Sequence, residues 1–373
     1  MKIFIYLLNL RRGGMEKEAI LLAKELIKNG DQVILAIAQG PNEYKDYLSR
    51  YSLEVKVLWK GQQPYFWTNI IGHAKSLKYF RNNFLADITV VFGTQALILA
   101  RMAGLSPILV SAQNSNAMHW HGWRPGYLLL KYLEKWAFQD KTLRIIGCSK
   151  AVTKTYKKRF KIPQARITTI KNASELEIKT KDKVKVKNNN TILMVGTLYS
   201  QKNYPMAFNG VRILKENGTP CKLRIAGDGP ELSSLKKLAQ KMKIDDLVQF
   251  LGQRKDIASL MQHSSIFWLT SNYEGFGLVL VEAMIAGIPI IATRVPGISE
   301  VIADKHDGLL VEINDAENLA KKTLTILRDP SLAKKFKENG KKKALTFSAP
   351  FMGKSYRTIF NKFYSPNVGN KFE

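Results

Sequence analysis

Short apolar runs alternate with amphipathic stretches along the first half of the chain. Residues 2–8 (KIFIYLL) have the pattern of a buried strand, residues 15–30 that of an amphipathic helix, and residues 32–38 that of a second strand. Further apolar runs follow at residues 88–93, 107–113 and 144–149. Strand runs separated by helical patterns are typical of a parallel sheet covered by helices on both faces. The first half is therefore predicted to be a Rossmann-like α/β domain.

A polar segment rich in lysine and asparagine, residues 175–190, separates this half from a second α/β pattern. Strand runs restart at residues 191–196, 222–227, 248–252, 266–271 and 289–293, and three helical patterns follow at residues 318–329, 330–345 and 347–364. We predict two Rossmann-like, doubly wound domains, residues 1–173 and 174–349, facing a central cleft. The C-terminal helix, about residues 350–373, is expected to pack back on the first domain. Because open α/β sheets bind ligands outside the carboxyl ends of their strands, the cleft is the expected site.

The composition fits a folded protein of two domains. The chain has 373 residues, of which 45% are hydrophobic and 24% charged, so each domain can bury a core of its own. Lys and Arg total 58 against 30 Asp and Glu, a net charge of +28. Such a charge attracts anionic partners, which could be nucleic acid, anionic lipid or a phosphorylated substrate.

The sequence also argues against several other classes of protein. Cys148 and Cys221 have neither CxxC nor paired spacing, which favours a reducing cytosol and predicts no metal site. Arg11 and Arg12 follow the first apolar stretch without a small-residue cleavage site, so a strand is favoured over a signal peptide. The longest apolar region, residues 88–110, is interrupted by glycine, arginine and proline and is not expected to span a membrane.

One stretch carries the most specific chemistry: SNYEGFGLVLVEAMIAGIPIIATRVPG, residues 271–297. Glu274 falls on the loop after a strand, and Glu282 falls about one turn into the helix that follows. Gly275 and Gly277 allow the backbone to approach a ligand closely, and the free N–H groups of a helix N-terminus suit a phosphate. For a bare pair of glutamates, the simpler interpretation is two solvated side chains on an ordinary strand–loop–helix unit.

The whole run resembles the E-x7-E signature of retaining GT-B glycosyltransferases, in particular glycosyltransferase family 4. The resemblance covers essentially the whole chain, more weakly over residues 40–145, and includes the stretches GGMEKEAILLAKELIKNG, IIGCSKAV, ITTIKNAS, VGTLYSQKNY, LRIAGDGPE and FLGQRKDI. It implies a GT-B fold with an acceptor-binding N-terminal domain and a donor-binding C-terminal domain. It also implies transfer of a hexose-type sugar from a UDP- or GDP-sugar with retention of configuration, without a cofactor or an obligatory metal.

The resemblance implies a role for each residue of this run. Glu274 would contact hydroxyl groups of the donor sugar and Glu282 those of the ribose, since an ionised carboxylate can accept two hydroxyl protons. The diphosphate would be held by backbone N–H groups of Gly275, Phe276, Gly277 and Leu278.

A cation near the diphosphate speeds its departure, because the leaving group gains negative charge in the transition state. Family members place an arginine and, five residues later, a lysine in the stretch that corresponds to VGTLYSQKNY. Here Lys202 occupies the lysine position, but Thr197 occupies the arginine position. Arg254 or Arg294 could supply the missing charge; an inactive relative is the alternative.

Two glycine-containing turns resemble further donor contacts. Gly13 and Gly14 follow the first strand, where family members bring a glycine loop against the donor phosphates and the acceptor. Gly252, Gln253 and Arg254 resemble the loop that accepts the nucleobase. Ordinary turn chemistry is an equally good explanation of both.

The family often carries a histidine after a strand of the N-terminal domain, facing the reacting centre. This sequence has Gln113 and Asn114 at that strand end. His119, or else His121, is therefore the candidate catalytic histidine, with an acceptor contact or a structural role as the alternative.

The basic residues of the first half include a dense cluster, which we expect on an exposed helix: Lys154, Lys157, Lys158, Arg159 and Lys161. Most charge runs are solvated faces, but a basic and aromatic surface could rest on anionic lipid.

The leading hypothesis is a cytoplasmic glycosyltransferase, peripheral on the inner face of the cell membrane, that extends a lipid-linked glycan in lipopolysaccharide, O-antigen, capsule or glycolipid synthesis. One alternative is a GT-B transferase with a soluble small-molecule or polysaccharide acceptor. An alternative of another class is a basic nucleic-acid-binding protein without catalysis. No recognised nucleic-acid module supports it, so no nucleic-acid partner is expected.

Overall fold

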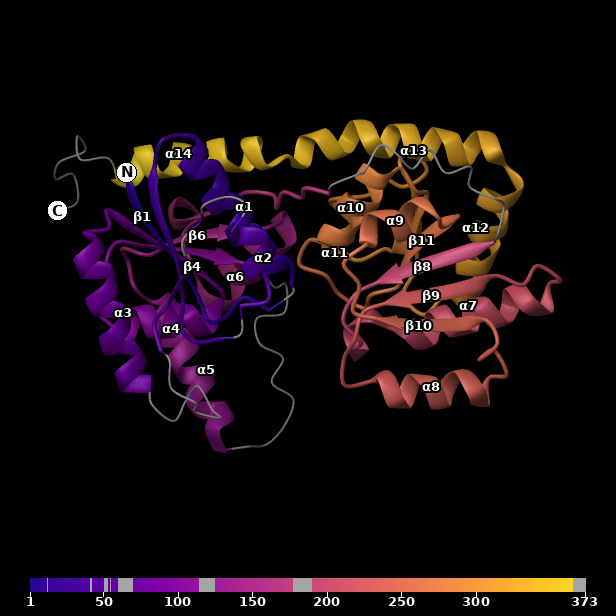
Figure 1. Ribbon diagram of the computed structural model, residues 1–373, viewed down its shortest axis with the longest axis horizontal. Helices are drawn as coiled ribbons and strands as arrows, with labels where there is room; N and C mark the ends of the chain where they lie inside the picture. The colour runs from indigo at the N-terminus through magenta and orange to yellow at the C-terminus, as the bar shows by residue number, and fades with distance from the viewer. Residues whose placement is uncertain are drawn as a thin grey trace. The chain divides into compact units, whose positions relative to one another are not determined.

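The computed structural model describes residues 1–11, 13–40, 42–49, 53, 55–59, 70–113, 125–176 and 190–364. The chain divides into two compact units, Met1–Ser174 with the C-terminal stretch from Ala349, and Glu175–Ser348. Each unit is built on one parallel sheet with helices on its faces (Figure 1). The α/β fold class expected from the alternating pattern is thus confirmed.

The sheet of the first unit has the strand order β3-β2-β1-β4-β5-β6-β7, and all neighbouring strands are parallel. Its strands are β1 (Lys2–Leu7), β2 (Gln32–Ile37), β3 (Val55–Val57), β4 (Ile88–Phe92), β5 (Ile108–Ala112), β6 (Arg144–Gly147) and β7 (Ile167–Thr169). Every strand predicted in this half forms. The edge strands β3 and β7 were not predicted, because three residues are too few for a hydrophobic pattern.

Helices cover both faces of this sheet. α1 (Gly14–Lys28) and α14 (Ala349–Tyr364) pack together on one face and share a hydrophobic core with β1, β2 and β4. α3 (Ile70–Phe84), α4 (Thr94–Met102) and α5 (Pro125–Phe138) lie on the other face, each in contact with the next (Figure 1). The unit also contains α2 (Lys45–Leu48), α6 (Lys150–Phe160) and the short 3-10 helix η3 (Gln164–Arg166).

Aromatic residues of α14 attach this helix to the first unit. Tyr356 and Phe360 are fully buried in the core shared with α1, and Tyr364 packs at its edge. The hydroxyl of Tyr356 donates to Oγ of Ser111 on β5 at 3.2 Å. The last helix of the chain therefore belongs to the core of the first unit.

The basic cluster expected on an exposed helix lies on α6. Lys154, Lys157 and Lys158 are exposed there. Arg159 instead forms an ion pair with Glu134 of α5, whose side chain is 1% exposed. Arg159 is thus exposed to solvent and also compensates a buried carboxylate.

The second unit has the strand order β10-β9-β8-β11-β12-β13, again with parallel neighbours. The strands are β8 (Thr191–Val195), β9 (Lys222–Ala226), β10 (Val248–Gly252), β11 (Ile266–Leu269), β12 (Ile290–Thr293) and β13 (Leu309–Val311). All but β13, another three-residue edge strand, were predicted. The strand order reverses between β8 and β11, which is the position where such sheets bind ligands.

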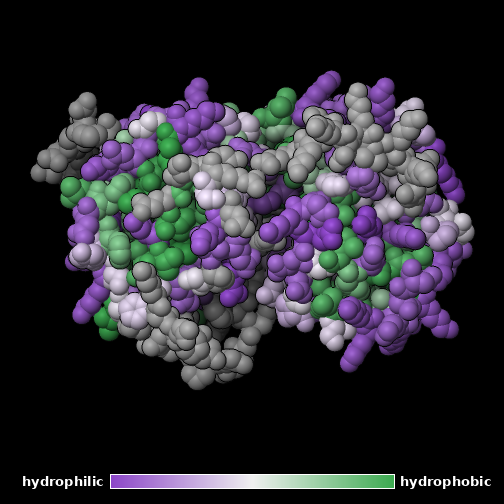
Figure 2. Space-filling model, in the orientation of Figure 1, coloured by the Kyte–Doolittle hydropathy of each residue, from purple (hydrophilic) through white to green (hydrophobic). Residues whose placement is uncertain are grey.

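The helices of the second unit lie between these strands or follow the last of them. They are α7 (Tyr204–Glu216), α8 (Leu232–Lys241), α9 (Ile257–Gln262), α10 (Leu278–Ala286), α11 (Pro296–Ser299), α12 (Ala316–Arg328) and α13 (Pro330–Ala344), with 3-10 turns η4 (Ser200–Lys202) and η5 (Leu345–Phe347). Hydrophilic residues cover much of the visible surface of both units, and the visible face of the first unit also has a broad hydrophobic area (Figure 2). Across the described ranges, no helix has the length and apolar character needed to cross a membrane.

Candidate functional site

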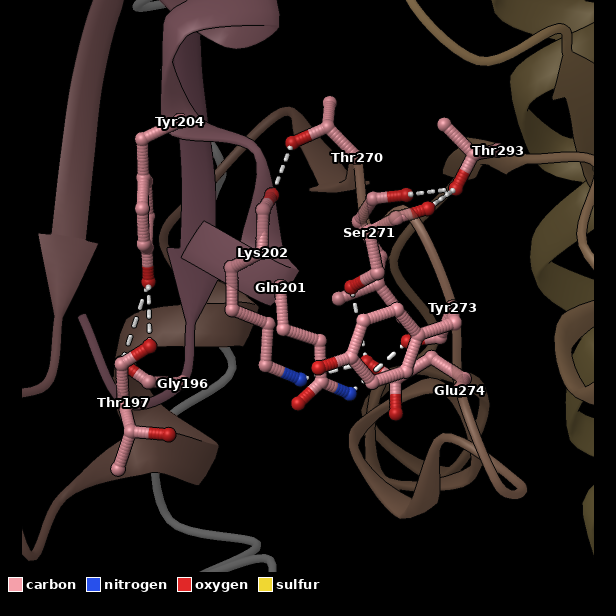
Figure 3. A network of polar contacts seen from close by, with 11 residues as sticks. Gly196, Thr197, Gln201, Lys202, Tyr204, Thr270, Ser271, Tyr273, Glu274 and Thr293 are labelled. Atoms are coloured by element: carbon pink, nitrogen blue, oxygen red, sulfur yellow. Dashed lines mark hydrogen bonds and ion pairs between the residues drawn. The ribbon is translucent and has the colours of Figure 1, made fainter. Parts of the chain in front are cut away.

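The candidate site lies at the carboxyl ends of β8 and β11, the adjacent strands between which the strand order reverses. The loop after β8 carries Lys202, and the loop after β11 carries Ser271 and Glu274. Because the two strands are parallel neighbours, both loops leave the sheet at the same edge. Figure 3 shows the side chains of Lys202 and Glu274 pointing toward each other.

Lys202 and Glu274 form an ion pair with little exposure to solvent. Nζ of Lys202 donates to Oε1 of Glu274 at 2.6 Å, and the hydroxyl of Ser271 donates to the same oxygen at 2.8 Å. The side chains of Lys202 and Glu274 are 15% and 9% exposed, so water screens their charges poorly. The structure thus brings together the cation and the carboxylate that the sequence singled out for the diphosphate and the sugar.

Hydroxyl groups fix the backbone of both loops. Oγ1 of Thr270 donates to the carbonyl of Lys202 at 2.8 Å. Oγ1 of Thr293, on the neighbouring strand β12, donates to the carbonyl of Ser271 at 2.6 Å. Sequence reasoning missed these residues, although short hydroxyl side chains directly after a buried strand could have indicated them.

Thr197, at the position where the family has arginine, is exposed on the loop after β8. The hydroxyl of Tyr204 donates to the carbonyl of the preceding Gly196 at 3.2 Å. Burial, reinforced by nearby carboxylates, raises the pKa of Tyr204 well above its usual value, so this hydroxyl stays protonated. Thr197 itself lies apart from the ion pair (Figure 3).

The two arginines considered as substitutes are both bound to carboxylates. Arg254 reaches Asp256 through Nε at 2.8 Å and Nη2 at 2.6 Å. Arg294 reaches Asp304 at 2.5 Å and Glu312 at 2.9 Å. Each guanidinium is paired in this structure and is also partly exposed, so its role as a replacement for the missing arginine stays a prediction.

Both glutamates of the E-x7-E pair are buried. Glu274 is 8% and Glu282 is 4% exposed, so the interpretation as two solvated side chains is wrong. Glu282 lies within α10, which follows Gly277 at φ 84° and ends at Gly287 at φ 70°. Both glycines have left-handed backbone conformations that other residues adopt at a cost.

The turn between Glu274 and Leu278 is packed tightly within the second unit. The ring of Phe276 is buried and lies 5.5 Å from that of Phe347. Gly297 packs so closely against the turn that a Cβ atom there would lie 2.3 Å from the carbonyl oxygen of Glu274. The turn, which includes Gly275, leads into the N-terminus of α10, an arrangement that suits a phosphate group.

The candidate nucleobase loop lies at the end of β10, two places from β8 in the sheet. Gly252 has φ 64°, and its carbonyl accepts a hydrogen bond from the N–H of Gly227 at 2.8 Å. Gln253 is exposed beside it. The loop therefore shares the sheet edge with the ion pair.

The candidate residues of the first unit lie on other loops. Gly13 precedes α1 in an extended conformation, and Gly14 is the first residue of that helix. A Cβ atom on Gly13 would lie 2.3 Å from Oε2 of Glu16, and burial raises the pKa of Glu16 to about 7. His119 lies outside the described residues, so its catalytic role stays a prediction.

A buried polar network of the first unit was not predicted. Nε2 of Gln113 donates to Oγ of Ser111 at 2.6 Å, and Oε1 of Gln113 accepts from Nδ2 of Asn172 at 2.7 Å. Glu18 of α1 is fully buried beside these groups, and burial raises the pKa of Glu18 to about 8. The available signal was a glutamate on the apolar face of α1, one turn before Leu22.

The remaining titratable groups include thiols and potential metal ligands among the residues that the structure describes. Cys148 and Cys221 are buried free thiols. In the part of the chain that the structure describes, no group of three or more His, Cys, Asp or Glu side chains could hold a metal ion.

Two family models and several known proteins match this chain over most of its length. The family model Glycosyltransferase Family 4 matches residues 12–177, and the model Glycosyl transferases group 1 matches residues 177–343. An uncharacterized glycosyltransferase of Haemophilus influenzae is 27% identical over 341 residues, 89% of this chain and 92% of that protein. A Campylobacter jejuni alpha-1,4-N-acetyl-D-galactosaminyltransferase is 26% identical over 356 residues, 93% of this chain and 94% of that one.

A solved structure has the same fold. Anabaena HepE in complex with UDP-glucose matches with a TM-score of 0.82 at 17% identity, over 97% of this chain and 100% of that chain. Two consecutive family models thus cover the two α/β units, and the E-x7-E glutamates lie buried at the switch point of the second. The chain belongs to the GT-B glycosyltransferases of the family 4 type.

Proposed function

We propose that this glycosyltransferase moves a hexose from a UDP- or GDP-sugar to a lipid-linked glycan, with retention of anomeric configuration. The observation that carries the proposal is the contact between Lys202 and Glu274 at the strand-order reversal of the second unit. A nucleotide sugar has a diphosphate that needs a cation and a sugar whose hydroxyls need an acceptor. The two side chains have these complementary properties.

Each group has a distinct role in the proposed reaction. Glu274 accepts hydrogen bonds from sugar hydroxyls, and Glu282 accepts them from the ribose. The N-terminus of α10 with its preceding turn holds the diphosphate through backbone N–H groups. Lys202 stabilises the charge that develops on the diphosphate as the bond to the sugar breaks. Because Lys202 supplies this charge, the proposed reaction needs no metal ion.

The donor class is supported by the fold and by a neighbour. HepE, which shares the fold, was solved with UDP-glucose. In this chain the turn of Gly252 and the exposed Gln253, at the end of β10, is the proposed contact for the nucleobase. Arg254 is bound to Asp256 there, so we propose backbone rather than guanidinium contacts to the base.

The acceptor class is supported by a relative and by the surface of the first unit. The name of the Campylobacter jejuni relative specifies a saccharide on PP-undecaprenol as its acceptor. On α5, Leu128, Leu129 and Tyr132 are 71%, 60% and 70% exposed, and Lys131 and Lys135 are exposed on the same helix. An apolar strip with basic neighbours suits an anionic bilayer surface. We therefore propose a peripheral position on the inner face of the cell membrane.

The donor site is tested first with nucleotides. Thermal unfolding of the whole chain is measured with UDP, GDP, ADP and CMP, because a ligand that binds only the folded state raises its stability. We expect UDP or GDP to give the largest shift. Calorimetry of Glu282→Ala with that nucleotide should then show affinity lower by about 1–3 kcal/mol, the range for hydrogen bonds to a charged group. Unchanged affinity would remove the ribose role.

Liposome co-sedimentation separates a lipid-linked acceptor from a soluble one. The protein is mixed with vesicles containing anionic lipid or only neutral lipid, at low and at high salt. Binding that requires anionic lipid and weakens with salt is expected. Equal partitioning to neutral and anionic vesicles, or none to either, would favour a soluble acceptor.

A further inference from the structure

Glu274 receives two hydrogen bonds, and both end on the same carboxylate oxygen. Nζ of Lys202 lies 2.6 Å and Oγ of Ser271 lies 2.8 Å from Oε1. Among the residues that the structure describes, none makes a hydrogen bond to Oε2 of Glu274. The carboxylate is therefore held by one oxygen, and the other is the oxygen that can accept from an outside hydroxyl.

Ser271 is placed to hold this orientation independently of Lys202. It is fully buried in the loop after β11, and its carbonyl accepts the hydrogen bond from Thr293 at 2.6 Å. The hydroxyl of Ser271 then reaches the side chain only three residues further along the same loop. Lys202, in contrast, reaches Glu274 from a different loop through a long side chain with many rotamers.

We propose that Ser271 is a positioning residue of the donor site, which holds Oε1 of Glu274 so that Oε2 is directed to the donor sugar. The inference rests on the proposed function, because it takes Glu274 as the carboxylate that binds the sugar. When a diphosphate attracts the ammonium group of Lys202, the hydroxyl of Ser271 remains as a donor to Oε1. Without that donor, a nearly buried oxygen would lose its hydrogen bond at the moment of donor binding.

The proposal predicts an effect on the sugar part of the donor alone. Ser271→Ala should weaken binding of a nucleotide sugar about 10-fold, in the range for a hydrogen bond to a charged group, and leave binding of the sugar-free nucleoside diphosphate unchanged. Ser271→Cys has a side chain of similar size with a weaker donor. Its affinity for the nucleotide sugar should lie between those of the parent and Ser271→Ala. A residue that only supported the fold would affect both ligands.

The experiment is calorimetry on the full chain with three ligand pairs, UDP and UDP-glucose, GDP and GDP-mannose, and ADP and ADP-glucose. The variants are Ser271→Ala, Ser271→Cys, Glu274→Ala and the double change of Ser271 and Glu274 to Ala. The matched control is Ser264→Ala in the same unit. Ser264 is also buried, but its hydroxyl donates to the carbonyl of Leu260 at 2.7 Å.

The inference is supported if Ser271→Ala weakens binding of the nucleotide sugar alone and causes no further loss of affinity in the Glu274→Ala background. The Ser264→Ala control should bind both ligands as the parent does. It is overturned if Ser271→Ala weakens both members of a pair equally, has no effect on either, or adds its full effect to that of Glu274→Ala. If Glu274→Ala itself fails to distinguish the sugar from the diphosphate, the proposed role of Glu274 is wrong. If the parent binds no pair, the donor site itself is wrong, and the inference falls with it.

Discussion

The charge of Lys202 has two partners in the proposed cycle. Before the donor binds, it neutralises Glu274 at 2.6 Å; during transfer, it faces the leaving diphosphate. The sequence identified both residues from their positions in motifs. It could not identify Ser271 as a partner of Glu274, because many serines follow strands and a hydrogen bond of 2.8 Å depends on how the loop folds.

Lys202→Ala should chiefly slow turnover. A fixed cation interacts more strongly with the transition state than with the bound donor, so we expect kcat at saturating donor to fall about 100-fold. Lys215→Ala is the matched control, since that lysine pairs with Asp246 at 3.3 Å in an exposed part of the same unit. A kcat equal to that of the parent would contradict the role of Lys202.

Glu18 makes the stability of the first unit depend on pH in a predictable way. Its pKa is raised from 4.5 to about 8 by burial, so the folded state keeps a proton that the unfolded chain releases between these values. Stability should therefore be highest below pH 4.5 as far as this group is concerned, and should fall by up to ~1.4 kcal/mol per pH unit until about pH 8.

Glu18→Gln removes this titration. Unfolding is followed from pH 5 to 9. The variant should lack the corresponding fall in stability, so its stability relative to the parent should rise with pH and level off above about pH 8. Glu216→Gln serves as the control, because Glu216 is exposed in an ion pair with Arg212. Identical pH profiles for the parent and Glu18→Gln would show that the buried carboxyl does not govern this range.

At the scale of elements, central strands were easy to predict and edge strands were not. The strands β1, β4 and β11 are buried on both faces and appear in the sequence as continuous apolar runs. β3, β7 and β13 have three residues each and form because a neighbouring strand offers its free backbone groups. The close packing of α11 against the loop after β11 could not be predicted either. The residue types at positions 295–297 do not indicate which loop they will contact.

Gly297→Ala tests that packing. The new Cβ atom would lie 2.3 Å from the carbonyl oxygen of Glu274 and 2.9 Å from the carbonyl carbon of Gly275, so the turn before α10 must move. We expect weaker binding of the nucleoside diphosphate and a lower melting temperature. Gly340→Ala in α13 is the control, since its Cβ atom would meet Met284 at an ordinary 3.4 Å. Normal nucleotide affinity in Gly297→Ala would mean that the turn does not bind the diphosphate.

At the scale of the whole molecule, the net charge of +28 is distributed over surfaces with different partners. Some basic residues are paired with buried carboxylates, as Arg159 is with Glu134. Others, such as Lys154, Lys157 and Lys158 on α6, face solvent. These exposed lysines are therefore the ones in which we test the proposed contact with an anionic membrane.

Changing Lys154, Lys157 and Lys158 together to Glu should reduce binding to anionic vesicles while the donor affinity and the fold remain. Each basic residue near such a surface contributes about 1 kcal/mol, so partitioning should fall by more than about 100-fold at low salt. The control carries the same change at Lys236, Lys237 and Lys241, which are exposed on α8 of the second unit. Equal sedimentation of both variants with the vesicles would show that α6 is only a solvated face.

The sequence by itself determined the two α/β units, their central strands and the family. These follow from apolar periodicity and from a long motif, both of which are local in the chain. Only the tertiary structure decided that Lys202 meets Glu274 across 72 positions, that Arg159 is neutralised by Glu134, and that Glu18 is buried without exposure. Hydrogen bonds, ion pairs and burial join residues that are distant in sequence, and their partners exist only once strand order and loop geometry have brought them together.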